Sequence, residues 1–323
     1  MDTHRDARRL GLYPPLEPTR TGMLDVGEGH RVYWEECGRP DGVPVIALHG
    51  GPGGGAAPAM RRFFDPTRYR ILIFDQRGCG RSRPFSEVRN NDTARLVADI
   101  ERLRDFFGVD RWVVFGGSWG ATLALAYARQ APEHVLALVL RGVFGCTKAE
   151  LDWFYRDGAN RLFPDVWDHF AGRLGPDEAD DVLRAYHARL MIEDPAARRE
   201  DALAWARWES ALISLHADPF TANPDSRRAD TLARMETHYF VNDGFLERDG
   251  VLLEDTAHLA DIPGVIVQGR YDMVTPPHTA WRLHKAWPGS RIEFVHDAGH
   301  AAGEPGTVDG LVRVTHAFAK RFS

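Results

Sequence analysis

The chain has 323 residues, of which 44% are hydrophobic and 27% are charged, values typical of a soluble globular protein. Its net charge of −6 argues against a nucleic-acid-binding surface, which needs clustered basic residues. No apolar run approaches the roughly 18 residues that span a bilayer, and the charged N-terminus lacks the apolar stretch of a secretory signal. With three widely spaced cysteines, which predict free thiols, these features predict a cytoplasmic protein.

The first half of the chain alternates between predicted strands and predicted helices. Residues 1–20 are proline-rich and predict an extended lead-in, and residues 21–38 predict a β-hairpin. Short, continuous apolar runs then predict buried strands. These runs cover residues 44–50, 70–76, 111–117 and 135–142.

Helices separate these strands. One helix can be capped by Asn91 or Asp92 and ends at Gly108, and an alanine-rich helix follows over residues 119–130. Strands that alternate with helices form βαβ units, so the sequence predicts a mostly parallel central sheet flanked by helices.

The pattern changes from about residue 147 to residue 240, where it is only helical and rich in aromatic side chains. The strand rhythm then resumes. The remaining predicted elements are a strand, a helix, a strand and a terminal helix, over residues 263–269, 277–287, 291–296 and 307–321. A helical block inside an α/β sheet predicts one core domain with an inserted helical cap. The predicted boundaries are 1–142 and 256–323 for the core and 143–255 for the cap.

Residues 116–120 read Gly-Gly-Ser-Trp-Gly and match the G-x-S-x-G motif of a nucleophile elbow. A predicted strand precedes the motif and a predicted helix follows it, which is the setting that the motif requires. A serine on such a turn exposes its hydroxyl at the end of the sheet. The sequence therefore predicts an α/β-hydrolase fold with Ser118 as the nucleophile.

A serine hydroxyl is a weak nucleophile near neutral pH and needs a base. Asp272 and His300 each follow a predicted strand, and the order serine, acid, histidine is the order of this fold. Loops after parallel strands meet at one edge of the sheet. We therefore expect His300 to act as the general base and Asp272 to orient its imidazole.

Other histidines and aspartates near the C-terminus compete for these roles. They are His258, His278, His284, His296, Asp261 and Asp297. His296 ends the last strand but lacks a glycine-lined loop, and Asp261 precedes its strand and so belongs to the opposite edge of the sheet.

The segment His-Gly-Gly-Pro-Gly-Gly-Gly over residues 49–55 follows the first core strand and resembles the HGGG-type loop that supplies an oxyanion N–H. The backbone N–H groups of Gly51 and Trp119 are the predicted oxyanion hole. The alternative is a phosphate-binding loop, but the segment lacks the G-K-[ST] ending and the G-x-G-x-x-G spacing of such loops.

Several segments together resemble the proline iminopeptidase family of α/β hydrolases. They are HGGPGGG (49–55), FDQRGCGRS (74–82), GGSWGATLALAYA (116–128), GRYD (269–272) and DAGH (297–300). The similarity continues through the cap and covers nearly the whole chain after residue 10. The resemblance implies release of N-terminal proline from peptides through an acyl-enzyme, without a cofactor or metal.

The resemblance also implies substrate-binding residues. Glu209 and Glu236 match two cap glutamates that bind the free amine, a role suited to charge-assisted hydrogen bonds. Two neighbouring carboxylates repel, so one pKa should rise unless a cation lies between them. Phe144 and Phe240 match apolar walls for the proline ring, and Phe154 stands where relatives carry a tyrosine.

Two other functions use the same pattern. An esterase, amidase or lactonase would share the triad but would not need the cap glutamates. A non-catalytic ligand-binding homologue would commonly lack one triad residue, whereas all three are present here. The expected partners are small peptides with a free N-terminus, rather than nucleic acid or membranes, and the sequence does not indicate an oligomeric state.

Overall fold

The computed structural model describes residues 9–216 and 224–323 of the chain. These residues contain an eight-stranded sheet in the order β1-β2-β4-β3-β5-β6-β7-β8. The strands are β1 Arg20–Gly27, β2 His30–Gly38, β3 Val43–Leu48, β4 Tyr69–Phe74, β5 Trp112–Ser118, β6 Val135–Val143, β7 Gly264–Gly269 and β8 Ser290–Val295. The pairs β1–β2 and β2–β4 are antiparallel and the other pairs are parallel, which confirms the mostly parallel sheet.

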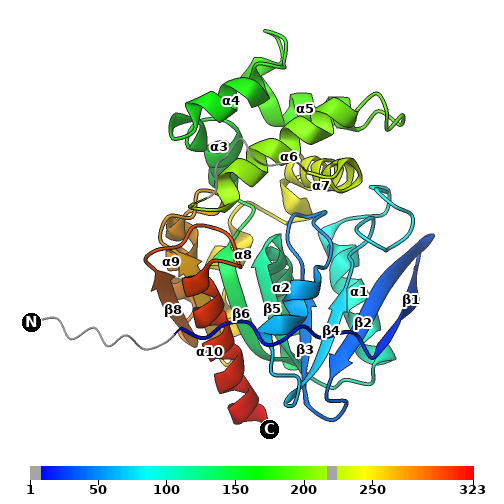
Figure 1. Cartoon of the computed structure of the whole chain (residues 1–323), viewed down its shortest axis with the longest axis vertical. Helices are drawn as coiled ribbons and strands as arrows, with labels where there is room; N and C mark the ends of the chain where they lie inside the picture. Colours follow the sequence, from blue (N-terminus) through cyan, green and yellow to red (C-terminus); the bar gives the residue numbers. More distant parts are fainter. Residues whose placement is uncertain (1–8, 217–223) are drawn as a thin grey trace, which may run out of the picture.

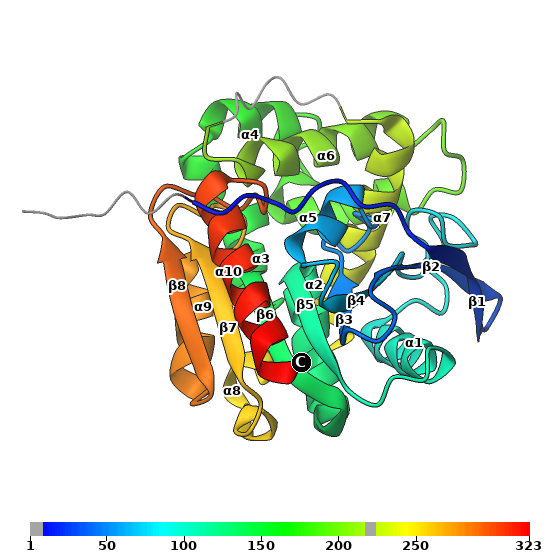
Figure 2. The same ribbon diagram turned by 60° about the horizontal axis from the view of Figure 1, so that its bottom comes forward.

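Helices cover both faces of this sheet (Figure 2). The core helices are α1 Thr93–Phe106, α2 Trp119–Gln130, α8 Val251–Glu254, α9 Pro277–Ala286 and α10 Pro305–Phe322. The side chains of β5 are apolar on both faces of the sheet, so both faces must be buried. Trp112 and Val114 pack in the hydrophobic cluster that includes α1 and α2, whereas Val113 and Phe115 pack in the cluster that includes α10.

The predicted core elements agree with these bounds to within two residues, apart from the lead-in, of which residues 1–8 lie outside the described part. Asp92, rather than Asn91, caps α1, because its side chain accepts a hydrogen bond of 2.9 Å from the Arg95 N–H. In the described residues, no helix is both long and apolar enough to cross a membrane.

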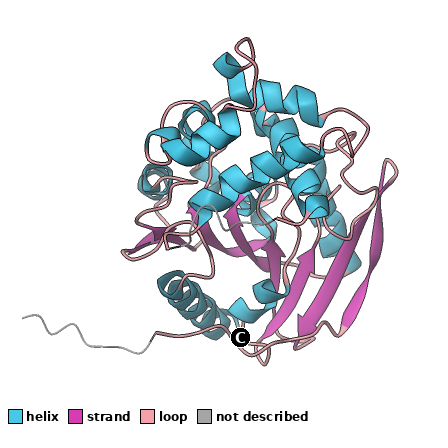
Figure 3. Cartoon of the chain, turned by 45° about the horizontal axis from the view of Figure 1, so that its top comes forward, coloured by secondary structure: helices cyan, strands magenta, loops and turns pink. Residues whose placement is uncertain are grey.

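A separate layer of helices lies over one edge of the sheet (Figures 1 and 3). These cap helices are α3 Lys148–Tyr155, α4 Pro164–Ala171, α5 Val182–Leu190, α6 Arg199–Ile213 and α7 Ser226–Phe240. Their interior is aromatic: Phe170 stacks on Tyr186 at 4.5 Å and on Trp208 at 5.5 Å between ring centroids. The extent of the cap, 143–255, stays a prediction.

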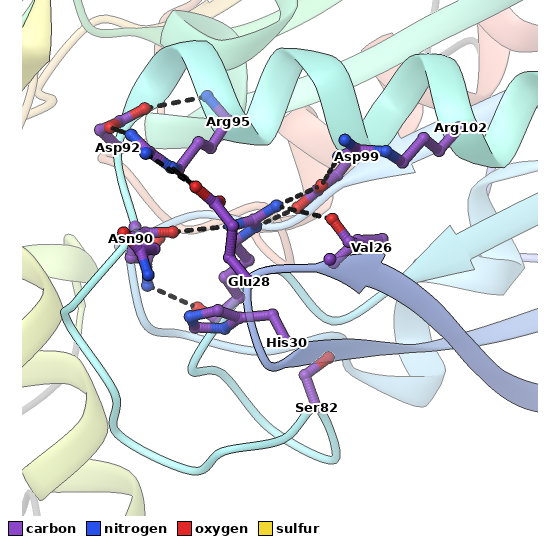
Figure 4. A network of polar contacts seen from close by, with 12 residues as sticks. Val26, Glu28, His30, Ser82, Asn90, Asp92, Arg95, Asp99 and Arg102 are labelled. Carbon is purple, nitrogen blue, oxygen red and sulfur yellow. Dashed lines mark hydrogen bonds and ion pairs between the residues drawn. The ribbon is translucent and has the colours of Figure 1, made fainter.

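A buried ion pair joins the hairpin β1–β2, the loop after β4 and α1 (Figure 4). Arg77 donates two hydrogen bonds to Asp99, of 2.6 and 2.9 Å, and both side chains are almost completely buried. Arg77 also donates to Glu28 at 2.8 Å and to the Asn90 carbonyl at 2.7 Å. These contacts fix the loop that follows β4, in which Gln76 is hydrogen-bonded to His49 of the predicted oxyanion loop.

Candidate active site

Ser118 ends β5 and immediately precedes the first residue of α2. Its backbone is strained, with φ 58° and ψ −127°, as expected for a non-glycine residue on a nucleophile elbow. The flanking glycines allow this turn to be tight. A Cβ atom on Gly116 would lie 2.1 Å from the Gly120 carbonyl oxygen, and one on Gly120 would lie 2.3 Å from the Leu48 carbonyl oxygen. The motif is therefore required by close backbone packing.

Asp272 and His300, from the loops after β7 and β8, contact each other directly. His300 Nδ1 lies 2.8 Å from Asp272 Oδ2 and 3.0 Å from Oδ1, and both residues are buried. The same carboxylate accepts hydrogen bonds from the Thr275 N–H at 2.8 Å, the Thr275 hydroxyl at 3.0 Å and the Gln268 amide at 3.1 Å. These donors hold Asp272 in a single orientation toward the imidazole.

The electrostatics of this pair favour an ionised acid and a neutral base. Burial alone would raise the pKa of Asp272, but His300, the Thr275 N–H and the nearby Arg141 together lower it. Burial lowers the pKa of His300, and Arg141 adds to that effect against the attraction of Asp272. His300 can therefore accept a proton near neutral pH.

Arg141, on β6, is hydrogen-bonded to Nε2 of His300, the ring nitrogen that would accept the proton of the nucleophile. Its Nη1 donates to His300 Nε2 at 3.0 Å and to the His300 carbonyl at 2.9 Å. A Cβ atom on Gly117 would lie 2.5 Å from Arg141 Nη2, so the guanidinium packs beside the elbow. Within the described part of the chain, Ser118 and His300 share no hydrogen bond, although both line one cavity of about 590 Å³.

The competing residues lie elsewhere. Asp297 forms an exposed ion pair with Arg9 at 2.7 Å, and His284 contacts the Ser290 hydroxyl at 2.8 Å. None of the competing histidines and aspartates lines either cavity that adjoins Ser118.

The predicted oxyanion residues lie beside Ser118. Gly51 lines both cavities that Ser118 lines, and Trp119 is the first residue of α2, so its N–H has no acceptor within the helix. Gln76 braces both segments: its N–H donates to His49 Nε2 at 3.0 Å, and its side-chain oxygen accepts from Trp119 Nε1 at 3.0 Å. These contacts fix the oxyanion loop against the elbow.

All the predicted substrate-binding residues line one small cavity, of about 20 Å³, together with Ser118 and Gly51. They are Phe144, Phe154, Glu209, Glu236 and Phe240. This volume admits little more than one water molecule. A ring the size of proline can therefore enter only if some of the lining side chains move.

Glu209 on α6 and Glu236 on α7 form a buried carboxyl pair in this cavity. Burial raises the pKa of Glu209 to about 7, and burial together with the Glu209 charge raises the pKa of Glu236 well above its ordinary value. Trp205 Nε1 donates to Glu236 Oε2 at 2.5 Å, whereas Glu209 Oε2 is buried with no hydrogen-bond partner in the described residues. The pair therefore offers a site for a cation.

Sequence reasoning did not identify Arg141, Glu150, Tyr155 or Thr275 as site residues. The signal for Arg141 is a lone charge at the end of an apolar run, and the signal for Glu150 is the capping box with Thr147. In the described residues, no group of three or more His, Cys, Asp or Glu side chains could hold a metal ion.

Comparison with known proteins agrees with this geometry. A family model described as the alpha/beta hydrolase fold matches residues 43–307. A curated relative from Xanthomonas citri, named proline iminopeptidase, is 53% identical over 95% of this chain and 99% of its own length. This chain belongs to the proline iminopeptidase family of α/β hydrolases. A relative from Arabidopsis thaliana, also named proline iminopeptidase, is 47% identical over 93% of this chain and 80% of its own length. One of the same name from Neisseria gonorrhoeae is 45% identical over 96% of this chain and 99% of its own length.

Solved structures show the same fold beyond the family. A bromoperoxidase from Bacillus anthracis matches with a TM-score of 0.64 at 18% identity, over 93% of this chain and all of that one. An esterase from Rhodococcus sp. ECU1013 matches with a TM-score of 0.58 at 17% identity, over 96% of this chain and all of that one. These matches support the α/β-hydrolase fold of this proline iminopeptidase family member and nothing about its substrate.

Proposed function

We propose that this chain is a serine aminopeptidase that releases N-terminal proline from peptides. The observation that carries the proposal is the buried pair of Glu209 and Glu236 in the cavity that opens on Ser118. An esterase of the same fold has no use for two carboxyl groups at that position. The names of the curated relatives, proline iminopeptidase, support the same activity.

The substrate amine binds first. A protonated proline nitrogen replaces the proton of the carboxyl pair and is held by Glu209 and Glu236 through charge-assisted hydrogen bonds. The ring then contacts Phe144, Phe154 and Phe240, which line the same cavity. An N-acylated substrate would leave the carboxyl pair without a cation and would be rejected strongly.

The chemistry proceeds from Ser118. The hydrogen bond that Arg141 donates to His300 Nε2 is replaced by one from the Ser118 hydroxyl. Nε2 then takes the proton of this hydroxyl while Ser118 Oγ bonds to the prolyl carbonyl carbon. The N–H groups of Gly51 and Trp119 stabilise the oxyanion. The C–N bond then breaks and the leaving nitrogen takes the proton from Nε2. Nε2 of His300 then takes a proton from a water molecule, whose oxygen bonds to the acyl carbon. The bond between this carbon and Ser118 Oγ breaks, proline is released, and Nε2 gives the proton to Oγ. Asp272 stabilises the imidazolium throughout.

The test compares prolyl-naphthylamide with N-acetyl-prolyl-naphthylamide and with an uncharged acyl ester. We expect rapid release from the free-amine substrate alone, and Ser118→Ala should lower its kcat/KM by about 10⁴-fold or more without unfolding. Equal rates on the free and acetylated amides would overturn the aminopeptidase proposal, and preference for the ester would favour the esterase.

A cytoplasmic location belongs to the same proposal. Its support is that Cys37, Cys79 and Cys146 are free and buried, as is common where thiols stay reduced.

A further inference from the structure

Two cavities meet at Ser118, and the part of the substrate placed so far, the prolyl group, occupies only one of them. The small cavity contains the carboxyl pair and the aromatic walls and would take the prolyl group. The larger one, of about 590 Å³, extends from Ser118 between the oxyanion loop, the loop after His300 and the adjoining ends of α6 and α7. Because the acyl group fills the small cavity, the leaving group must lie in the larger one.

Of the charged Asp, Glu and Arg side chains that line the larger cavity, all but one already have a proposed role or a hydrogen-bond partner in the described residues. Glu209 belongs to the amine site, and Arg141 donates to His300. Asp225 caps α7, accepting the Arg228 N–H at 3.0 Å. The guanidinium of Arg228 also lines this cavity but has no hydrogen bond or ion pair with any residue in the described part of the chain.

Arg228 lies within electrostatic reach of the proposed amine site and of the oxyanion loop. Its charge opposes the burial that raises the pKa of Glu209, and it adds to the burial that lowers the pKa of His49. A dipeptide carries its C-terminal carboxylate on the α-carbon that is bonded to the leaving nitrogen. An anion at that position would lie in the larger cavity, which Arg228 also lines, and arginine binds carboxylates well.

We propose that Arg228 binds the C-terminal carboxylate of the leaving residue, so that the substrates are short prolyl peptides with a free C-terminus, dipeptides above all. This inference rests on the proposed aminopeptidase function and adds the substrate class. It assigns the larger cavity as a leaving-group site whose specificity comes from Arg228, which is unpaired within the described part of the chain.

The experiment measures kcat/KM for prolyl-alanine and for prolyl-alaninamide, which differ only in the terminal charge. We expect the wild-type protein to prefer the acid by about tenfold, the value of one charge-assisted hydrogen bond. Arg228→Gln should bring the ratio of acid to amide close to one, and Arg228→Lys should retain part of the preference. Because the ratio is taken within each variant, differences in folding or yield cancel.

Arg227 offers a matched control on the same helix. Its guanidinium lies 4.0 Å from the centroid of the Phe85 ring. Arg227 lines a second cavity, which Arg228 also lines, but it does not line the larger cavity at Ser118. Arg227→Gln removes the same charge and should leave the ratio of acid to amide unchanged. A wild-type ratio near one, or an equal loss in both variants, would overturn the inference. If neither prolyl substrate is cleaved while an ester is, the proposed function itself fails.

Discussion

The buried ionisable side chains of the site respond to burial in opposite directions. Burial raises the pKa of the carboxyl groups of Glu209 and Glu236, which face each other, and lowers the pKa of His300. Asp272 differs from the glutamates because a histidine and several donors surround it, so it stays ionised. The same physical effect therefore leaves one site ready for a cation and keeps the base neutral.

This contrast predicts a pH dependence of substrate binding. Glu209 has a pKa of about 7, above the ordinary 4.5, so it becomes protonated as the pH falls through about 7 and attracts the protonated amine less. We expect KM for prolyl-naphthylamide to rise below about pH 7, while kcat falls only at lower pH, because the pKa of His300 is lowered.

The measurement is KM and kcat as functions of pH for the wild-type protein and for Glu209→Gln. The variant should have a higher KM that no longer changes in this range, because its amide does not titrate. A wild-type KM that stays constant between about pH 5.5 and 8 would contradict the assignment of Glu209.

At the level of elements, the helices α6 and α7 carry the residues of the proposed amine site, and α6 also contacts the predicted base. Glu209 and Trp205 lie on α6 and Glu236 on α7. The last residue of α6, Ile213, accepts a hydrogen bond of 3.0 Å from the His300 N–H. The cap helices therefore do more than cover the sheet, because one of them also holds the loop of the predicted base.

Trp205→Phe tests this helix pair. The change keeps an aromatic ring beside Tyr155 but removes the Nε1–H that donates to Glu236 at 2.5 Å. The buried carboxylate loses a donor, so we expect KM for prolyl substrates to rise about tenfold and the protein to lose about 1–3 kcal/mol of stability. Steady-state kinetics and denaturant unfolding measure the two effects.

Trp208→Phe is the matched control, because Trp208 lies on the same helix and is equally buried but donates to the Phe154 carbonyl at 3.2 Å. It should lose similar stability with a smaller change in KM. A rise in KM that is equal in the two variants would show that Trp205 acts through packing alone.

At the scale of the whole molecule, buried charges outside the site connect separate segments of the chain. Arg77 and Asp99 connect the loop after β4 with α1, and burial raises the pKa of Asp99 despite the arginine. The pair therefore contributes more to the positions of these two segments than to the free energy of unfolding, since removing two charges from water is costly.

Arg77→Met should lower the free energy of unfolding by about 3–5 kcal/mol, because it leaves the buried Asp99 with only the half-exposed Arg102 as an ion-pair partner. Arg77→Met combined with Asp99→Leu should lose less than the single variant, because no buried charge remains. Urea unfolding of both variants measures this difference. A double variant that is less stable than the single one would show that the pair is a net source of stability.

The sequence by itself determined the local features of this protein. Apolar periodicity predicted the strands and helices, since burial of one face or both leaves a pattern in neighbouring residues. G-x-S-x-G located the elbow because its constraint, backbone packed against backbone, acts over five residues. The positions of Asp272 and His300 followed from strand ends, which meet at one edge of a parallel sheet.

The tertiary structure alone decided which groups face one another. It placed Arg141 against His300 Nε2, left Arg228 without a partner among the residues that the structure describes, and brought Glu150 and Tyr155 into the cavity of the cap glutamates. These contacts join residues on different elements, and their distances and burial depend on how the cap packs over the sheet. Since electrostatic effects depend on distance and burial, the pKa shifts and the unpaired cation became visible only in three dimensions.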